Sequence, residues 1–218
     1  MVIEPHDLLK IDAKHLISHS PIPDWAIQAM NMAPYVVVRR AHAPKGQIAV
    51  GIRGKARNER FGAFIPDDAF TYQIKPEELT DRTLWENKPS PVFLSLKIAS
   101  EILAKHKLVW GPGGSAGFEL ATGNVTVTAE SDLDIVLRAP KPIPIHTAAE
   151  IMNAMKSCPA RVDIQAETPA GSFSLLEYAN GSATLLVKTK FGPILCENPW
   201  KSEMNKSIEP REKPLFVN

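Results

Sequence analysis

The sequence predicts a mixed α/β (α+β) fold, in which a smaller β-rich N-terminal unit precedes a larger domain built on a mixed sheet. β-Branched runs dominate residues 35–65, and a helical apolar period marks residues 91–107. Strand-like and helix-like patterns then follow one another to residue 196. With 218 residues and 44% hydrophobic content, the chain can bury a substantial core. This composition excludes the disordered and fibrous classes.

The N-terminal unit is expected to span residues 1–80 and to be built around a hairpin. Residues 35–39 and 47–53 are β-branched runs separated by the turn signal Pro44-Lys-Gly46. A third strand is expected over residues 60–65, because Pro66-Asp-Asp68 then interrupts the pattern. The polar stretch 80–91 is expected to serve as a linker.

A helix is expected to open the second domain, which should span residues 90–200. Ser90 is a suitable N-cap and Pro91 suits the first helical position. Apolar residues then recur at helical spacing to about Lys107; they are Val92, Leu96, Ala99 and Leu103.

The remaining elements follow from shorter patterns. After the glycine-rich stretch 111–117 we expect a short helix over 118–122 and a strand over 125–138 with a break near 129–131. Further expected elements are a helix over 147–156, a strand over 161–167, a helix over 174–179 and strands over 183–188 and 193–196. The charged, proline-punctuated tail 201–218 is expected to be poorly ordered.

Charge is unevenly distributed along the chain. The net charge is +1, but residues 39–60 carry seven basic residues and one acid, so that segment is +6 and the rest of the chain is −5. Near-neutral total charge argues against a nucleic-acid partner. The sequence contains no apolar run long enough to suggest a membrane partner. Two cysteines, Cys158 and Cys196, are too few for a disulfide framework, so we expect reduced thiols and a cytoplasmic protein.

Three acids form the main candidate site. Asp132 and Asp134 should point to the same face of a strand, because side chains alternate along it. Asp163 lies between Val162 and Ile164 in a later strand, and the three carboxylates would converge if the two strands were neighbours. Hard divalent cations such as Mg²⁺ take oxygen ligands, and carboxylates of this kind can hold the metals of a phosphoryl transfer. An Asp-x-Asp pair also occurs on solvent-facing strand edges.

Gly114 and Ser115 would complement the acids. A glycine-rich turn at the start of a short helix presents backbone N–H groups to an anion such as a phosphate. The order of these features along the chain is more informative than any one of them, since a glycine-rich turn alone is usually only a turn.

In that order, the motifs resemble those of the nucleotidyltransferase superfamily of the polymerase-β type. Sixteen residues separate Ser115 from Asp132, and this long spacing fits one branch. The chain is similar to the malonate decarboxylase holo-[acyl-carrier-protein] synthases, also called phosphoribosyl-dephospho-CoA transferases. The words that carry the resemblance are Pro5-His-Asp-Leu-Leu9, Val36-Val-Val-Arg-Arg-Ala41, Ala49-Val-Gly-Ile-Arg-Gly54, Arg60-Phe61, Trp110-Gly-Pro-Gly-Gly-Ser-Ala-Gly-Phe-Glu-Leu-Ala-Thr-Gly123, Ser131-Asp-Leu-Asp134, Val162-Asp-Ile-Gln-Ala-Glu-Thr168, Gly171-Ser-Phe-Ser-Leu175, Gly192-Pro193 and Asn198-Pro-Trp200.

This resemblance implies a nucleotidyltransferase-like fold and a defined reaction. The 2′-(5″-phosphoribosyl)-3′-dephospho-CoA group would pass from its triphosphate precursor to a serine of the apo acyl-carrier subunit of malonate decarboxylase, with release of pyrophosphate. Asp132 and Asp134 would hold Mg²⁺, and Asp163 would be a third ligand or the base that deprotonates the serine. Gly114 and Ser115 would hold the triphosphate.

The basic segment has two interpretations. Arg39, Arg53 and Arg60 recur in the resembling words and suit bidentate phosphate contacts, so they are candidate substrate-binding residues. They are equally compatible with a solvated hairpin. Two alternative functions stay open at this point: a nucleotidyltransferase with another acceptor (RNA, a protein or a small alcohol), and a non-catalytic subunit that binds the carrier protein.

Overall fold

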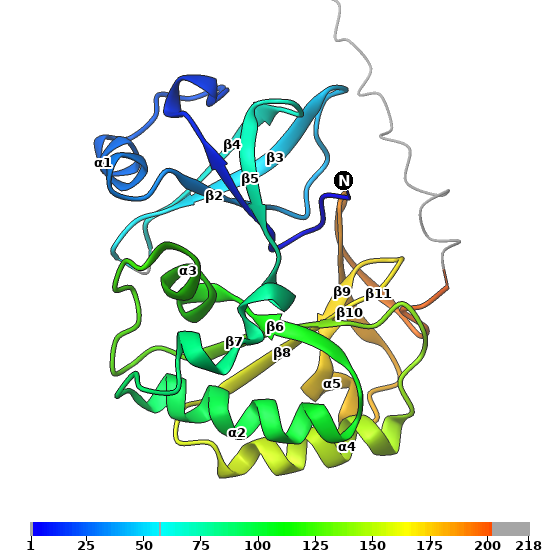
Figure 1. Cartoon of the computed structure of the whole chain (residues 1–218). Helices are drawn as coiled ribbons and strands as arrows, with labels where there is room; N and C mark the ends of the chain where they lie inside the picture. The colour runs from blue at the N-terminus through cyan, green and yellow to red at the C-terminus, as the bar shows by residue number, and fades with distance from the viewer. Residues whose placement is uncertain (1, 57, 202–218) are drawn as a thin grey trace, which may run out of the picture.

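The computed structural model describes residues 2–56 and 58–201, and it contains two β-sheets that lie one above the other in Figure 1, with one helix between them and other helices on the outer faces. The fold is therefore α+β, as the sequence predicts. Arg57 of the basic segment and residues 202–218 of the predicted tail lie outside the described residues. No helix within the described ranges is long and apolar enough to cross a membrane.

The N-terminal sheet has five antiparallel strands in the order β4-β3-β2-β1-β5. Its strands are β1 (Leu8–Ile11), β2 (Tyr35–Val38), β3 (Gln47–Arg53), β4 (Arg60–Pro66) and β5 (Phe70–Ile74). The three predicted strands are confirmed as β2, β3 and β4. The turn between β2 and β3 contains Gly46 at φ +77°, which a glycine adopts without strain.

Four short elements of this unit are not predicted from the sequence. They are η1 (Ala13–His15), α1 (Asp24–Met32) and the strands β1 and β5, which pair with each other. Helix α1 buries only Ala26 and Met30, against the apolar face of the sheet. An apolar surface this small leaves a weak periodic pattern, and packing decides that the helix forms.

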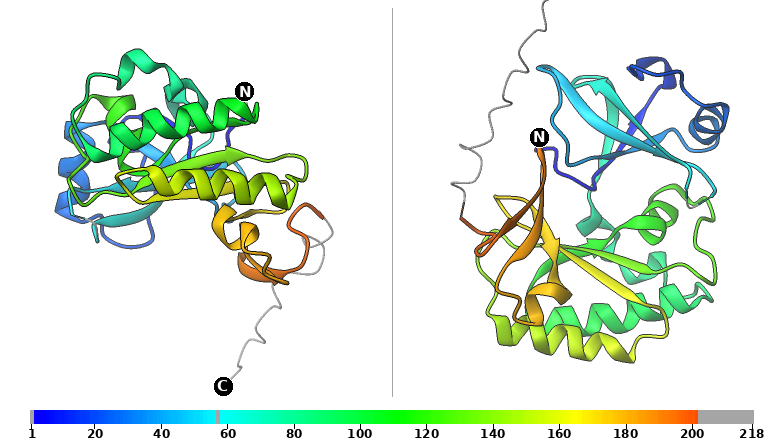
Figure 2. Two further views of the ribbon diagram at one scale, coloured as in Figure 1. Left: turned by 90° about the horizontal axis from the view of Figure 1, so that it is seen from below. Right: turned by 180° about the vertical axis from the view of Figure 1, so that it is seen from behind.

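The second sheet has six strands in the order β11-β10-β9-β8-β7-β6, and β7 and β8 run parallel. Its strands are β6 (Val109–Pro112), β7 (Leu133–Arg138), β8 (Val162–Glu167), β9 (Ser172–Ser174), β10 (Leu185–Thr189) and β11 (Gly192–Cys196). Helices α2 (Pro91–Lys105) and α4 (Ile145–Ala154) lie side by side across one face, as Figure 2 shows from below. Helix α3 (Gly114–Thr122) and the N-terminal sheet lie on the other face (Figure 1).

Local signals account for α2. The Ser90 hydroxyl accepts a hydrogen bond from the Phe93 N–H at 3.2 Å, which is the predicted N-cap contact. The four predicted core positions of the helix are fully buried against the second sheet. The predicted linker 80–91 begins at the last residue of η2 (Pro76–Thr80) and contains η3 (Arg82–Leu84) and Trp85, which is 1% exposed in the same core.

Two predicted elements begin at different residues. Helix α3 starts at Gly114 rather than at residue 118, and β7 starts at Leu133 rather than at residue 125. The carboxylate of buried Glu119 accepts hydrogen bonds from the Thr126 and Val127 N–H groups, both at 2.9 Å. Those N–H groups are then not available to a strand ladder, so residues 123–132 form a loop with a turn at the predicted break.

The later elements agree with the sequence pattern. They are α4 with η4 (Met155–Ser157), β8, the helix α5 (Leu175–Ala179), β10 and β11. The two layers are joined by packing as well as by charge: Phe118 of α3 contacts Leu8 and Ala33 of the N-terminal unit. The face of the second sheet that α3 covers is therefore the face that meets the N-terminal sheet.

Candidate functional site

Two carboxylates lie next to each other at the start of the parallel strand pair. Asp134 of β7 is the direct register partner of Asp163 of β8, so their side chains share the face that meets the N-terminal sheet. Asp132 directly precedes β7 and is partly buried. Leu133 is fully buried on the opposite face and anchors the strand in the core.

The electrostatics of Asp134 reflect this crowding. Burial raises its pKa, and the charges of Asp163 and Asp132 raise it further, whereas Arg53 and His6 lower it. Negative charge is thus concentrated at one point on a rigid strand pair. A cation placed there would relieve the repulsion.

A helix N-terminus lies directly against this pair. Strand β6 ends at Pro112, and the Gly113 N–H donates to the Asp134 carbonyl oxygen at 2.9 Å. Gly114 follows at φ +55°, and a Cβ placed on it would lie 1.8 Å from Asp134 Oδ2. A glycine is therefore required, and the first N–H groups of α3 start beside the carboxylate. Ser115, the next residue, is 4% exposed, and its carbonyl oxygen accepts from the Thr126 hydroxyl at 2.9 Å.

Gln165 and Lys188, which are not among the predicted site residues, extend the site along the same face. The Gln165 side-chain amide donates to both carboxylate oxygens of Asp163, at 3.3 and 3.2 Å. Lys188 Nζ on β10 donates to Gln165 Oε1 at 3.3 Å. The signal that could have identified Gln165 is its position two residues after Asp163, which places it on the same strand face.

Arg53 is the predicted basic residue that the fold brings to the acids. It is partly buried, and burial and the charge of Arg60 lower its pKa, whereas the Asp134 carboxylate raises it. Arg60 is the direct partner of Arg53 on β4, and its Nη1 donates to the Glu59 carbonyl at 2.9 Å.

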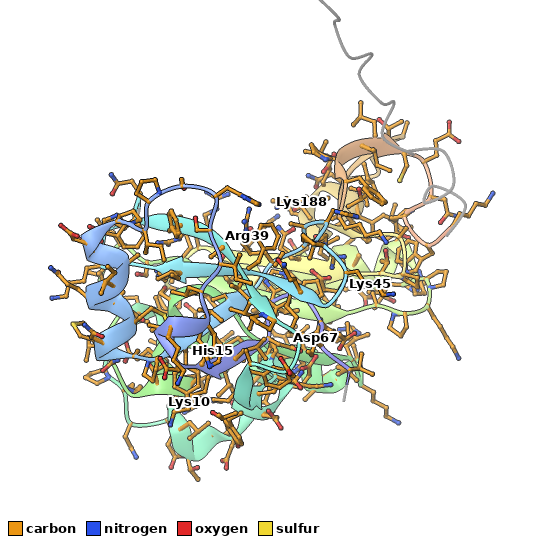
Figure 3. All side chains as sticks on the ribbon, turned by 90° about the horizontal axis from the view of Figure 1, so that it is seen from above. Lys10, His15, Arg39, Lys45, Asp67 and Lys188 are labelled. Atoms are coloured by element: carbon orange, nitrogen blue, oxygen red, sulfur yellow. The ribbon has the colours of Figure 1, made fainter. Side chains whose placement is uncertain are left out.

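Arg39 lies on the N-terminal sheet just after β2. A Cβ on Gly62 would lie 2.3 Å from Arg39 Nη1, and one on Gly51 would lie 3.2 Å from its Cδ, so these glycines make room for the arginine. Seen from above in Figure 3, Arg39 and Lys188 are drawn near each other, and Lys10 and His15 lie away from them.

His6 contacts the end of β8, four residues beyond Asp163. Its Nε2 is 3.0 Å from Glu167 Oε1, and its backbone adopts the left-handed φ of +76°. Burial, with the charges of Arg40 and Arg138, lowers the pKa of His6 to about 4, so the ring is neutral near pH 7. Arg40 also pairs with Glu167, which is almost completely buried. This network links the segment before β1 and the loop after β2 to the end of β8.

A cavity of about 560 Å³ opens at the other end of β7 and β8. Arg138 and Glu167, the last residues of these strands, help to line it, and none of the three predicted acids does. The cavity is therefore distinct from the carboxylate site.

The carboxylates at this site suit a magnesium ion that phosphates of the substrate also help to hold. Asp134 and Asp163 are neighbours, but among residues 2–56 and 58–201 no three His, Cys, Asp or Glu side chains form a group that could hold a metal ion. Mg²⁺ commonly binds through one or two carboxylates plus waters and substrate phosphates. The residues present fit that mode of binding and not a cage made by the protein alone.

Comparison with known proteins assigns the family. Residues 79–199 match the model of the phosphoribosyl-dephospho-CoA transferase MdcG C-terminal domain, and residues 4–76 match its N-terminal domain. Proteins named phosphoribosyl-dephospho-CoA transferase from Pseudomonas aeruginosa and Pseudomonas putida are 38% and 37% identical to this chain. The alignments cover 91% and 90% of this chain and 94% of each relative. A protein of the same name from Azotobacter vinelandii is 36% identical, over 91% of this chain and 94% of that relative. No solved structure matches the chain. The chain therefore belongs to the phosphoribosyl-dephospho-CoA transferase family and is a transferase.

Proposed function

We propose that this transferase attaches the 2′-(5″-phosphoribosyl)-3′-dephospho-CoA group to a serine of the apo acyl-carrier subunit of malonate decarboxylase. The donor would be the corresponding triphosphate, and pyrophosphate would be released. The observation that carries the proposal is the position of Asp134 beside Asp163, with the Gly113–Gly114 turn against its carboxylate. Phosphoryl transfer depends on positioning and on neutralising charge, and fixed anionic metal ligands beside a backbone phosphate cradle can supply both.

Asp134 and Asp163, with Asp132 next to them, would hold Mg²⁺. When bound, the ion would neutralise charge on the phosphates and on the leaving pyrophosphate. The raised pKa of Asp134 supports this assignment, because clustered carboxylates are the groups that gain most from a cation.

The triphosphate would lie at the N-terminus of α3. The backbone N–H groups of Gly114 and Ser115 would bind phosphate oxygens, aided by the positive end of the helix dipole. Arg53, which the Asp134 charge already influences, would approach from the N-terminal sheet, and Arg39 and Arg60 would extend the positive surface. A guanidinium can bind two phosphate oxygens at once.

The bond changes define what the protein must position. The serine oxygen forms a bond to the α-phosphorus, and the bond from this phosphorus to the bridging oxygen of pyrophosphate breaks. The serine proton leaves with a base. Asp163 has two candidate roles, as a third metal ligand or as that base, and Gln165 orients its carboxylate for either. We place the reaction in the cytoplasm, where the free Cys158 and Cys196 would stay reduced.

The test combines the full chain, the triphosphate donor, Mg²⁺ and the apo-carrier subunit. We expect the carrier to gain the mass of the prosthetic group on one serine and an equal amount of pyrophosphate to appear. Asp132→Ala and Asp134→Ala should remove both signals while the protein stays folded. Modification of a different carrier protein alone would show that the acceptor is wrong, and full activity in either variant would show that the site is wrong.

A further inference from the structure

The hairpin of β10 and β11 exposes two leucines on one face. Leu186 and Leu195 are direct cross-strand partners and are 44% and 70% exposed. On the opposite face of β10, Leu185 and Val187 are fully buried in the core. Strand β11 is the edge of the sheet. Cross-strand apolar pairs stabilise a sheet when they are covered, so an exposed pair on an edge suggests a partner.

This leucine pair lies on the same face as the carboxylates. Residues that are directly paired in a sheet point to one face. Gln165 pairs with Ser174, and Ser172 pairs with Lys188, so Leu186, two residues before Lys188, also shares that face. The contact of Lys188 Nζ with Gln165, 3.3 Å away, agrees with this register. The face that carries Asp163 therefore continues across β9 to the hairpin.

The hairpin is held in place at its tip. The His42 N–H, from the loop after β2, donates to the Lys190 carbonyl at 2.8 Å. The His42 ring stacks on Phe191 with ring centroids 5.7 Å apart. Because both sheets hold the hairpin, a partner would meet a preorganised surface, and little conformational entropy would be lost on binding.

Charge indicates the kind of partner. Lys188 is exposed, lies two residues after Leu186 on the same face and reaches Gln165 with its Nζ, and exposed Lys190 follows at the hairpin tip. Lysines around an apolar pair complement a protein that surrounds an apolar side chain with carboxylates. Three strand spacings, about 15 Å, separate β8 from β11, which a small docked protein can span.

We propose that the exposed face of the hairpin, formed by Leu186, Lys188, Pro193 and Leu195, is the docking surface for the acidic protein that receives the transferred group. This inference rests on the proposed function, because it assumes a protein acceptor. The acceptor would contact the leucines and direct its serine along the face toward Asp163. The N-terminus of α3 would stay free for the donor.

The test uses Leu195→Glu in the full chain, with Leu94→Glu as the matched control. Leu94 is 53% exposed on α2, on the opposite side of the sheet. We expect Leu195→Glu to raise the KM for the apo-carrier subunit about tenfold, because the new carboxylate repels an acidic partner. The KM for the donor and the kcat at saturating carrier should not change, and Leu94→Glu should behave as wild type. An unchanged carrier KM, or an equal rise in donor KM, would overturn the docking surface.

Binding without catalysis separates this inference from the proposed function. Apo-carrier binding is measured by calorimetry without donor or Mg²⁺, for wild type and both variants. Loss of binding in Leu195→Glu alone supports the docking surface even if no group is transferred. Equal binding by wild type and Leu195→Glu refutes it even if transfer proceeds. The docking surface would also be refuted if wild type transferred the group but showed no apo-carrier binding in calorimetry.

Discussion

Gly114 and Asp134 are in such close contact that a single methyl group at Gly114 would overlap the carboxylate: a Cβ would lie 1.8 Å from Oδ2. The contact joins the two halves of the candidate site, since Gly114 starts α3 and Asp134 belongs to β7. The helix N-terminus and the acid therefore cannot be altered independently.

Gly114→Ala should reduce transfer at least a hundredfold, because the new methyl group displaces the Asp134 carboxylate. Its φ of +55° adds a backbone cost of about 1 kcal/mol. Gly123→Ala is the matched control: Gly123 has φ +76° and open space around its Cβ position. Urea unfolding should show a similar backbone cost in both variants, and a transfer assay should show a loss in Gly114→Ala alone. Equal activity of the two variants would contradict the contact.

Asp134→Asn should stabilise the protein near pH 7 while abolishing transfer. Burial and neighbouring acids raise the pKa of Asp134 in the folded state, so ionised Asp134 weakens folding at pH values above the raised pKa. As pH falls through the raised pKa, the wild-type carboxyl takes up a proton and the penalty disappears. The difference in unfolding free energy between the variant and wild type should therefore shrink toward acid pH.

The effect of Mg²⁺ on the melting temperature is a second test that uses Asp134→Asn. Mg²⁺ should raise the melting temperature of wild type, because an ion that binds only the folded state stabilises it. Asp134→Asn should show little of this increase. An equal increase in both proteins would place the bound ion elsewhere.

Gln165→Leu should lower kcat about tenfold with little change in stability. The substitution removes the two hydrogen bonds to Asp163 and the partner of Lys188, but Gln165 is only partly buried. Steady-state kinetics should show an effect on kcat larger than that on the donor KM, because the amide orients the carboxylate and does not contact the donor. Gln165→Glu would place a further negative charge at Asp163 and should not restore the activity. Recovery in that variant would argue against an orienting amide.

Glu167→Gln should destabilise the fold by about 3 kcal/mol, because it leaves the partly buried Arg40 without its carboxylate partner. The Glu167 side chain is 5% exposed and also contacts His6. The control is Glu101→Gln, whose carboxylate lies 3.9 Å from Arg82 with both side chains more than half exposed. Such surface pairs contribute about 0–1 kcal/mol. Chemical denaturation of both variants measures their free energies of unfolding. Equal losses would show that the Glu167 network stabilises the fold no more than the surface pair does.

Much of the candidate site follows from local sequence. Asp134 and Asp163 are recognisable because single acids interrupt apolar strand patterns, and Asp132 because it forms an Asp-x-Asp pair with Asp134. Gly114-Ser115 is recognisable because a glycine-rich turn precedes a helix. Helix α2 and strands β3 and β8 were predicted within a few residues of their ends. These features depend on neighbours a few positions away, which the sequence displays directly.

Other parts depend on contacts between distant segments. Strands β1 and β5 are short, and they form by pairing with distant segments: β1 pairs with β2 and β5, and β5 pairs with β1 at the sheet edge. Residues 125–132 carry a strand-like pattern, yet Glu119 takes up the N–H groups of Thr126 and Val127. Short elements and competing hydrogen bonds are decided by tertiary packing, because their local preferences are weak.

The mixed α+β class, the family resemblance and the candidate acids follow from patterns that can be read along the chain. That β7 and β8 are parallel neighbours, which brings Asp134 beside Asp163, and that Gln165 and Lys188 join them are properties of the folded structure. The difference lies in the sequence separation of the contacts. Periodicity records which side of an element is buried, whereas strand order and register are set by burial and hydrogen bonding between residues tens of positions apart.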